Sequence, residues 1–479
     1  MKVVVIGIDG LDRELLNKFE EFLPNFRILK ENSPNIRLKS VFPPDSPTAW
    51  ASIYTGKNPA QHGIISFRDP FNEIKYGSYI GNDISGRTFW DVAGRIGKRV
   101  CVLFPHMGYP VWEVNGIMIG RTTEVDIKDF DIQCWPEELV SNYDLKGLKP
   151  LTSYPVNIGD IIEPTKKVIL NEMKVALQLF NDIDWDLYFY YSSSLDNIQH
   201  LFWMYCDKDD PYYEEGNSYE NVILDFYMFY DRNVIGPLMD NLDDETALIV
   251  LSDHGHAMRP VKVVNINEIL RRKGFLKLAD EKDIKSNLIN KIKKTILSVV
   301  DEHRSVGKLA SLFLRLFPRA MRYYVNTTLI DGSLSLAYLS DPSGGIKSYS
   351  YAGIRINKEV IDSYDSLREE LIDLLLSIKD PKGKKLVEWA ARREDVYEGD
   401  HLEKYPEILF KLVDEWGVGW DVDEEIFSES SSHKLHSGNH RAETPVLFVY
   451  NTNLKSISEE MDLMDISPLI LTILKEDTS

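Results

Sequence analysis

The sequence predicts an α/β fold, in which a mostly parallel sheet has helices on both faces and is interrupted by a long α+β insertion. Short uninterrupted apolar runs recur along the chain, which is typical of strands buried on both faces. Stretches with helical periodicity separate these runs over the first 265 residues, as in sheets covered by helices. The strand pattern then returns after about residue 440, beyond a middle part of different character.

Five apolar runs are the predicted strands of the core. The first is VVVIGI at 3–8, which is followed by Asp9 and Gly10. The others are RVCVLF at 99–104, LYFYY at 187–191, ALIVL at 247–251 and VLFVY at 446–450. Helical patterns lie between them, for example at 164–180 and 219–240.

The middle of the chain has a different pattern. Residues 284–300 place isoleucines and leucines on one helical stripe, and residues 285–322 contain nine Lys or Arg and two acidic residues. Residues 333–420 indicate mixed α+β structure, with an amphipathic helix around 366–378. We therefore expect the core to comprise 1–280 and 421–479, with a cap at 281–420.

The composition restricts the class of protein. With 43% apolar and 27% charged residues the chain is ordinary globular protein, which excludes disorder, collagen and coiled coil. A net charge of −20 argues against a nucleic acid polymer as partner. The three cysteines, Cys101, Cys134 and Cys206, are too scattered for a disulfide framework or a cysteine zinc site. Neither a membrane span nor a signal peptide is evident, so we expect a soluble cytoplasmic protein.

Acidic residues and histidines follow the predicted strands. Asp9 follows the first strand, Asp196 the run at 187–191, and Asp253 with His254 the run at 247–251, while His440 precedes the last strand. Ligands of open α/β sheets bind at the carboxyl ends of the strands. Converging carboxylates are unfavourable unless a cation or proton compensates their charge. A divalent metal is the most economical explanation.

The spacing of these residues supports metal binding. Asp196 and His200 are four residues apart, which places both on one face of a helix. The remaining histidines of interest fall in two short segments, His254 with His256, and His433, His436 and His440. Mixed Asp and His ligands suit zinc, manganese or iron. Each piece alone has a simpler interpretation, namely a helix cap, a solvated helix face or a turn, but together they favour two metals.

A nucleophile is predicted at the start of a helix. Ser46 fits an N-cap, Pro47 the first helical position and Gly56 the residue after the helix, which gives a helix over about 47–55. The helix N-terminus favours an anion at Ser46. A hydroxyl there beside a cation is the arrangement of an activated oxygen nucleophile. Without metals, Ser46 would be only a cap.

Six sequence segments together resemble a known family. They are IGIDGLD at 6–12, SPTAWASIYTGKNPAQHGI at 46–64, RTFWDVAGRIGKRVCVLFP at 87–105, DNIQHLFW at 196–203, SDHGH at 252–256 and SGNHRAETP at 437–445. The chain resembles the type I phosphodiesterase/nucleotide pyrophosphatase branch of the alkaline phosphatase superfamily, and in particular its archaeal and bacterial phosphohydrolases or phosphomutases. The resemblance implies an alkaline phosphatase-like core and is loose over 285–420.

The resemblance also implies roles for single residues. One metal would be held by Asp9, Ser46, Asp253 and His254, and the other by Asp196, His200 and His440. The ions would be zinc, with manganese as the alternative, and Ser46 would form a phosphoserine intermediate. Ala49 stands where nucleotide pyrophosphatases carry an Asn that binds the phosphoryl oxygen. His256 replaces a residue that is usually apolar or aromatic, so it is left outside the ligand set.

We therefore expect a two-metal phosphohydrolase that acts on a small-molecule phosphate ester. A phosphodiesterase is favoured because no Arg follows Ser46 closely and Lys57 lies at the far end of the helix. A phosphomonoesterase or a phosphomutase is the alternative. A rival of another class is a non-catalytic, metal-stabilised protein that docks through 284–322 on anionic lipid or on a partner. We favour a role for this segment as a cap over the active site, where its charge attracts phosphate.

Overall fold

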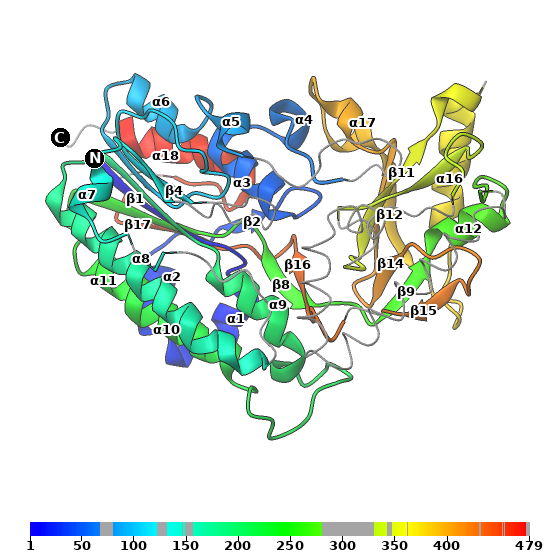
Figure 1. Ribbon diagram of the computed structural model, residues 1–479, viewed down its shortest axis with the longest axis horizontal. Helices are drawn as coiled ribbons and strands as arrows, with labels where there is room; N and C mark the ends of the chain where they lie inside the picture. The colour runs from blue at the N-terminus through cyan, green and yellow to red at the C-terminus, as the bar shows by residue number, and fades with distance from the viewer. Residues whose placement is uncertain are drawn as a thin grey trace.

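The computed structural model describes residues 1–67, 80–121, 132–145, 147–148, 157–279, 330–342, 347–361, 363–430, 433–452, 454 and 456–475, and its core is a seven-stranded sheet (Figure 1). Across the sheet the strands are β17 (Leu447–Tyr450), β7 (Thr246–Leu251), β1 (Lys2–Ile8), β6 (Leu187–Ser192), β3 (Val100–Leu103), β4 (Gly116–Arg121) and β5 (Ile132–Trp135).

The central five strands of this sheet are parallel, which confirms the predicted α/β class. Val3 of β1 lies opposite Leu187 of β6 and Ala247 of β7. The edge strands β17 and β5 are antiparallel to their neighbours. An apolar run indicates that a strand is buried but not whether it runs parallel or antiparallel to its neighbour, so the orientation of β17 was not predictable. The short strands β4 and β5 were missed because glycine, Arg121 and Gln133 interrupt their apolar pattern.

Helices cover both faces of the sheet, as predicted. Val4, Ile6 and Ile8 of β1 face one apolar cluster, and Val3 and Val5 face the other, as the two-residue period of a strand requires. The first face is covered by α1 (Arg13–Lys18), α2 (Pro24–Glu31), α8 (Ile162–Asp182), α9 (Ser194–Cys206), α10 (Val222–Tyr230) and α11 (Gly236–Met239). The second is covered by α3 (Ser46–Thr55), α6 (Phe89–Arg95) and α18 (Ile466–Lys475) (Figure 1).

The helical pattern predicted over 219–240 is confirmed, and the helix contains a π-helical turn that was not predicted. The chain there forms α10, a π-helical turn η3 (Asp231–Ile235) and α11. Within η3, the Asp231 carboxylate accepts hydrogen bonds from the Phe26 backbone N–H and from Asn25. Pro237 follows at the start of α11 and has no N–H to continue the ladder. A tertiary contact and a proline therefore accompany the π-helical turn inside an otherwise regular helix.

The predicted helix at 47–55 exists but begins one residue earlier. Asp45 is the N-cap of α3, and the first helical hydrogen bond runs from the Ala49 N–H to the Asp45 carbonyl. The prediction that Ser46 is the cap was therefore wrong, and Ser46 lies in the first turn. Gly56 ends the helix at φ 64°, a left-handed conformation that glycine adopts without strain.

A second, smaller part of the molecule is built on antiparallel strands. Its four-stranded sheet runs β10 (Ala337–Ser340), β11 (Tyr351–Ile356), β13 (Ile408–Leu412), β12 (Val387–Arg392). A three-stranded sheet of β14 (Trp416–Gly419), β9 (Lys262–Asn265) and β15 (Phe427–Glu429) adjoins it, with helices α12 (Ile266–Arg272) and α16 (Tyr364–Ser377). Helix α16 confirms the amphipathic helix predicted around 366–378. The basic segment 284–322 lies outside the described residues.

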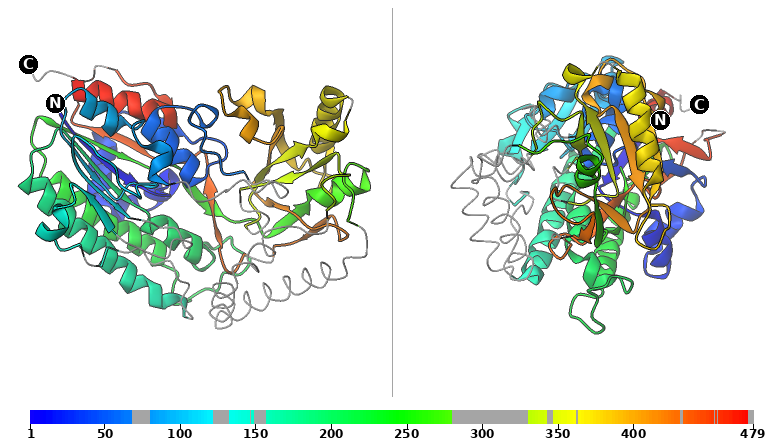
Figure 2. Two further views of the ribbon diagram at one scale, coloured as in Figure 1. Left: turned by 45° about the horizontal axis from the view of Figure 1, so that its top comes forward. Right: turned by 90° about the vertical axis from the view of Figure 1, so that its right-hand side faces the viewer.

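A two-stranded ribbon lies between the core and this smaller part (Figures 1 and 2). Its strands, β8 (Gly255–Met258) and β16 (Gly438–Arg441), pair antiparallel, with His440 directly opposite His256. His440 was predicted just before the last core strand and lies within this ribbon. The ribbon therefore carries histidines to the edge of the core sheet.

Short elements complete the described chain. They are η1 (Glu20–Phe22), β2 (Arg37–Lys39), α4 (Pro59–His62), α5 (Gly81–Ile84), α7 (Leu139–Asn142), η2 (Ile158–Ile161), η4 (Lys358–Val360), α17 (Arg393–Val396), η5 (Leu402–Lys404), β18 (Glu460–Asp462) and η6 (Leu463–Asp465). A search of the described helices finds none with the length and apolar character needed to cross a bilayer.

Candidate metal centre

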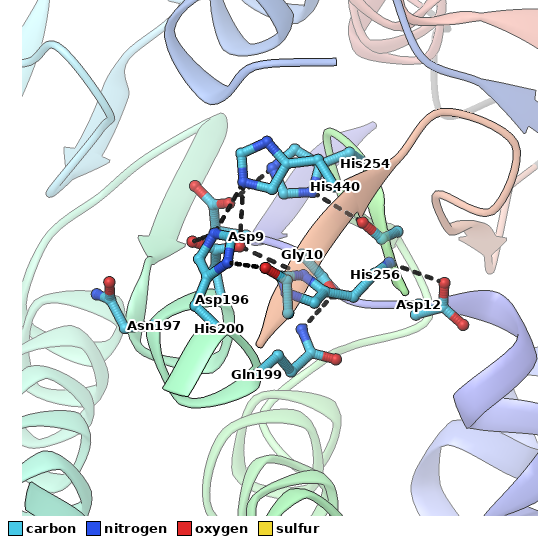
Figure 3. Close-up of polar contacts among 12 residues, drawn as sticks. Asp9, Gly10, Asp12, Asp196, Asn197, Gln199, His200, His254, His256 and His440 are labelled. Carbon is cyan, nitrogen blue, oxygen red and sulfur yellow. Dashed lines mark hydrogen bonds and ion pairs between the residues drawn. The ribbon is translucent and has the colours of Figure 1, made fainter. Parts of the chain in front are cut away.

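The predicted site residues gather at the carboxyl edge of the parallel sheet. Asp9 follows β1, and Asp253 and His254 follow β7. Asp196 lies in the first turn of α9, just after β6, and His200 is one turn further along the same helix. Because β1, β6 and β7 are adjacent and parallel, their ends bring the three carboxylates together, and Figure 3 shows Asp9 and Asp196 at this edge.

The first group contains Asp9, Ser46, Asp253 and His254. His254 Nε2 lies 3.4 Å from Asp9 Oδ1 and 3.2 Å from Asp253 Oδ2. The Ser46 hydroxyl lies 3.2 Å from the same nitrogen and 3.4 Å from Asp9 Oδ1. The ligand atoms of Asp9, Asp253 and His254 are close enough to hold one metal ion, with the Ser46 oxygen beside them.

The second group contains Asp196, His200 and His440. His200 Nε2 lies 3.4 Å from Asp196 Oδ2, and His440 Nε2 lies 3.7 Å from Asp196 Oδ1. The two Nε2 atoms are 2.9 Å apart. The stacked rings of His254 and His440, whose centroids are 3.8 Å apart, connect this group to the first. The structure thus brings all seven predicted residues into two adjacent groups, and Figure 3 shows Asp9, Asp196, His200, His254 and His440 among them.

Backbone carbonyls fix the tautomer of the three predicted histidine ligands. The Nδ1 atoms of His200, His254 and His440 lie 2.9, 3.0 and 2.8 Å from the carbonyls of Gly438, Gly255 and Pro44. A carbonyl can only accept, so Nδ1 carries the hydrogen and each Nε2 presents a lone pair to the cluster. The neighbouring lone pairs of His200 and His440 repel each other unless a proton or cation lies between them.

Two buried carboxylate oxygens also point to a cation. Asp196 Oδ1 and Asp253 Oδ2 have no hydrogen-bond partner among the described residues. Asp9 is held differently, since its Oδ2 accepts hydrogen bonds from Tyr191 (2.5 Å) and from the Trp50 indole (3.1 Å). Buried charges are normally paired or bound to metal. The donor set, with oriented imidazoles and open carboxylate oxygens, fits divalent metal ions.

The pKa values show how costly these charges are without a cation. Burial raises the pKa of the Asp9 carboxyl to about 6, and burial and neighbouring carboxylates raise the pKa values of Asp196 and Asp253 well above the usual range. Burial lowers the pKa of His254 to about 3 and those of His200 and His440 well below normal. The histidines are therefore neutral, ready to bind metal, whereas the ionised carboxylates need compensation.

Sequence reasoning missed two cations near this cluster. The guanidinium of Arg259 donates to the Gly438 carbonyl (2.9 Å), which also accepts from His200. The Lys347 ammonium lies 5.8 Å from the ring centroid of Tyr349, whose ring is 5.9 Å from that of His440. Arg259, three residues after His256, could have been marked from the sequence. Lys347 could not, because the smaller part of the molecule brings it to the core.

The remaining histidines of interest have separate environments. His433 pairs with Asp210, with 2.8 Å between His433 Nε2 and the carboxylate. The His436 ring lies 5.8 Å from that of His200, centroid to centroid. His256, which was left outside the ligand set, lies close to Asp196 and His254 and forms a third group with them.

The fold and site together define a metal-dependent hydrolase of phosphoric esters with an alkaline phosphatase-like core. The family model described as type I phosphodiesterase/nucleotide pyrophosphatase matches residues 3–418, so the chain belongs to this family and is an enzyme. The resemblance seen in the sequence motifs is thereby confirmed. A search of curated protein sequences finds no match to the chain.

Solved structures share the fold at low sequence identity. Phosphonoacetate hydrolase from Sinorhizobium meliloti, in complex with phosphonoformate, is 14% identical with a TM-score of 0.57, covering 99% of this chain and 96% of its own. Murine ectonucleotide pyrophosphatase/phosphodiesterase 5 is 14% identical with a TM-score of 0.53, covering 100% and 96%. An inactive form of the murine protein was solved with AMP. These likenesses establish the fold alone.

Proposed function

We propose that the chain hydrolyses phosphodiesters through a phosphoserine intermediate on Ser46, with two divalent metal ions held by the two ligand groups. One observation carries this proposal: the Ser46 hydroxyl lies at the start of α3, 3.2 Å from His254 Nε2 and 3.4 Å from Asp9 Oδ1. A serine with a role only in the helix would not be expected to face a carboxylate and an imidazole that follow strands β1 and β7.

Ser46 acts as the nucleophile in the first step. When bound, the two metal ions would stabilise charge on the attacking and leaving oxygens. The Ser46 oxygen attacks phosphorus, the bond from phosphorus to the leaving alcohol breaks, and the alcohol takes a proton as it departs. Because the Gly255 carbonyl fixes the tautomer of His254, Nε2 would be a metal ligand, and the Ser46 hydroxyl hydrogen would pass to solvent water rather than to this ring. In the second step water attacks phosphorus and Ser46 leaves with its hydrogen restored.

The start of α3 supports charge on the phosphoryl group. The first hydrogen bond inside this helix is made by the Ala49 N–H, so earlier first-turn N–H groups have no partner within the helix. Their dipoles favour an anion at this end. This backbone contribution would replace part of what an Asn side chain at position 49 supplies in nucleotide pyrophosphatases.

The two groups differ in the metal that their ligands favour. The Asp196 group offers one carboxylate and two imidazoles, which suits zinc. The Asp9 group offers two carboxylates, one imidazole and a hydroxyl, a set that also tolerates manganese. We therefore propose zinc in the Asp196 group and zinc or manganese in the Asp9 group.

Hydrolysis of a phosphomonoester is a second candidate, and Arg259 and Lys347 favour it. Two divalent ions would more than neutralise the three carboxylates of the site. Arg259 and Lys347 add positive charge that acts on Asp196 and His200, while Asp45 offsets part of it. An excess of positive charge favours a dianionic monoester over a monoanionic diester. A phosphomutase would use the same groups and return the phosphoryl group to substrate.

The test compares two substrates on one preparation. The chelated protein is loaded with zinc or manganese and assayed with bis-p-nitrophenyl phosphate and p-nitrophenyl phosphate. Metal-dependent turnover with a higher kcat/KM for the diester supports the proposal. A higher kcat/KM for the monoester would replace it with the second candidate, and metal binding without either activity would contradict both.

A further inference from the structure

His256 is a buried polar side chain that the proposed mechanism does not use. Its side chain has no exposed surface, and neither ring nitrogen has a hydrogen-bond partner among the described residues. An imidazole in such a place forfeits its hydrogen bonds to water without replacement, which costs free energy. Apolar or aromatic residues would fill the same space without this cost. The presence of an imidazole therefore indicates that one of its nitrogens binds a ligand.

The ribbon positions His256 beside the second ligand group. His256 and His440 are directly opposite each other in the β8–β16 pair, so both side chains project from the same face of the ribbon. This face packs against α9, which carries Asp196 and His200. The His256 ring centroid is 4.6 Å from that of His200 and 6.0 Å from that of His440 (Figure 3).

The open atoms of His256 and Asp196 face each other. His256 Nδ1 lies 3.5 Å from Asp196 Oδ1, the carboxylate oxygen that has no hydrogen-bond partner in the described part of the chain. The same oxygen lies 3.7 Å from His440 Nε2. We propose that His256 is a further protein ligand of the metal held by Asp196, His200 and His440. The site would then offer three imidazoles and one carboxylate.

This inference rests on the metal binding of the proposed function but not on the ester that is hydrolysed. A fourth protein ligand would raise the affinity of this group for zinc over that of a three-ligand site. The rival interpretation is a positioning role, in which His256 Nδ1–H donates to Asp196 and never touches the metal. The two differ in the number of imidazoles bound to metal.

The experiment uses zinc alone as the probe. Apoprotein is prepared for the wild type, His256→Gln and His256→Phe, and zinc is titrated against a chromophoric chelator. His433→Gln is the matched control, because it removes another buried imidazole that faces a carboxylate. We expect both His256 variants to bind one of the two zinc ions about tenfold or more weakly, and His433→Gln to bind like the wild type.

X-ray absorption at the zinc edge then counts imidazoles. With two equivalents of zinc, the wild type should show four imidazoles shared between two ions, and the His256 variants three. Weaker binding with an unchanged imidazole count would overturn the proposal in favour of positioning, and unchanged affinity would overturn it outright. Absence of zinc binding by the wild type would instead overturn the proposed function and this inference together.

A melting experiment keeps the test valid if one variant folds poorly. His256→Phe removes an unpartnered polar ring from the core, so the apoprotein should melt at the wild-type temperature or above. Its zinc-induced rise in Tm should be smaller than that of the wild type. An equal rise in both proteins would overturn the proposal.

Discussion

Asp9 depends on two neighbours that no sequence pattern marks. Tyr191 and Trp50 donate hydrogen bonds to the same carboxylate oxygen, and both lower the pKa that burial raises. This leaves Asp9 Oδ1 for Ser46 and His254. The hydrogen bonds therefore orient the carboxylate and keep it ionisable.

Replacing Tyr191 with Phe should move metal binding to higher pH. Loss of a hydrogen bond to a carboxylate costs about 1.5–3 kcal/mol, which corresponds to a rise of about one unit or more in the pKa of Asp9. Protons then compete with zinc over a wider range. The measurement is zinc affinity between pH 5 and 8, with Tyr188→Phe as control, since Tyr188 donates to the Ala176 carbonyl away from the site. An unchanged pH midpoint would contradict this role.

Zinc binding by the wild type should release protons, and most of them at low pH. The pKa of Asp9 is raised to about 6, so this carboxyl is largely protonated at pH 5 in the metal-free protein, and the pKa values of Asp196 and Asp253 are raised in the same direction. His254, with a pKa of about 3, is already neutral there. Affinity should therefore rise as pH increases through 6.

Calorimetry of zinc binding in buffers of different ionisation enthalpy counts these protons. Greater release at pH 5 than at pH 8 is expected. Release that is greater at pH 8 would show that the carboxyls are not the competing groups.

The sequence alone indicated the residues that strand ends and helical spacing bring together. Asp9, Asp253 and His254 follow adjacent parallel strands, and Asp196 and His200 are one helical turn apart, so simple geometry predicts their proximity. Tyr191 and Trp50 lie within buried, apolar stretches and look like ordinary core residues. Their roles depend on which side of β6 and α3 faces Asp9, which requires the tertiary structure.

At the scale of secondary structure, Asp12 holds together helix α1, strand β8 and the loop that follows β16. Its Oδ1 accepts from the Leu15 N–H at the start of α1, and its Oδ2 accepts from the His256 backbone N–H of β8 and from the Thr444 hydroxyl. The ribbon that carries His440 is thus tied to the loop that carries Asp9. Asp12 belongs to this support and not to the metal ligands.

Asp12→Ala should destabilise the protein and loosen the ribbon. It removes a helix cap worth about 1 kcal/mol and leaves two buried donors unpaired at about 1–3 kcal/mol each, so we expect a loss of roughly 3–7 kcal/mol. Asp12→Asn keeps an acceptor for the cap and should lose less. Urea unfolding of the metal-free proteins measures both. Equal stability of Asp12→Ala and the wild type would contradict the fastening role.

The elements themselves were predictable where burial and periodicity agree. The buried strands β1, β3, β6 and β7 lie where their apolar runs placed them. The π-helical turn η3 inside the helix and the use of Asp45 as the cap of α3 were not predictable, because both depend on local contacts that the sequence pattern does not show. A serine and an aspartate in sequence are both good caps, and the backbone of the loop decides between them.

At the scale of the whole molecule, the smaller part contributes charge to the core. Lys347 lies just before β11, and its positive charge acts on the site through space. Burial is the main cause of the lowered pKa values of His200 and His440, and the charge of Lys347 lowers them further. The net charge of −20 would otherwise repel a phosphate ester. The change of pattern after residue 280 predicted a separate α+β part, but its contacts with the core could not be read from periodicity.

Lys347→Met should affect a monoester more than a diester. The dianion interacts more strongly with the lost charge, so KM for p-nitrophenyl phosphate should rise about tenfold and that for bis-p-nitrophenyl phosphate by less, with little change in kcat. Lys358→Met is the control, because Lys358 faces Glu407 in the smaller part. Steady-state kinetics at low salt measure the change in KM for each substrate. An equal change for both substrates would contradict the claim that Lys347 distinguishes a dianion from a monoanion.

The central claim is that Ser46 attacks phosphorus, and trapping the covalent intermediate tests it most directly. Zinc-loaded enzyme is mixed with bis-p-nitrophenyl phosphate, quenched in acid within milliseconds to seconds, and analysed by intact and peptide mass spectrometry. We predict a burst of p-nitrophenol and a p-nitrophenyl phosphoryl adduct on Ser46. Ser46→Thr, which keeps a hydroxyl, should retain the adduct.

Ser46→Ala should lose both the adduct and turnover, by about a thousandfold or more, while the folded protein still binds zinc through the remaining ligands. Turnover by Ser46→Ala at the wild-type rate, or an adduct on another residue, would contradict the account.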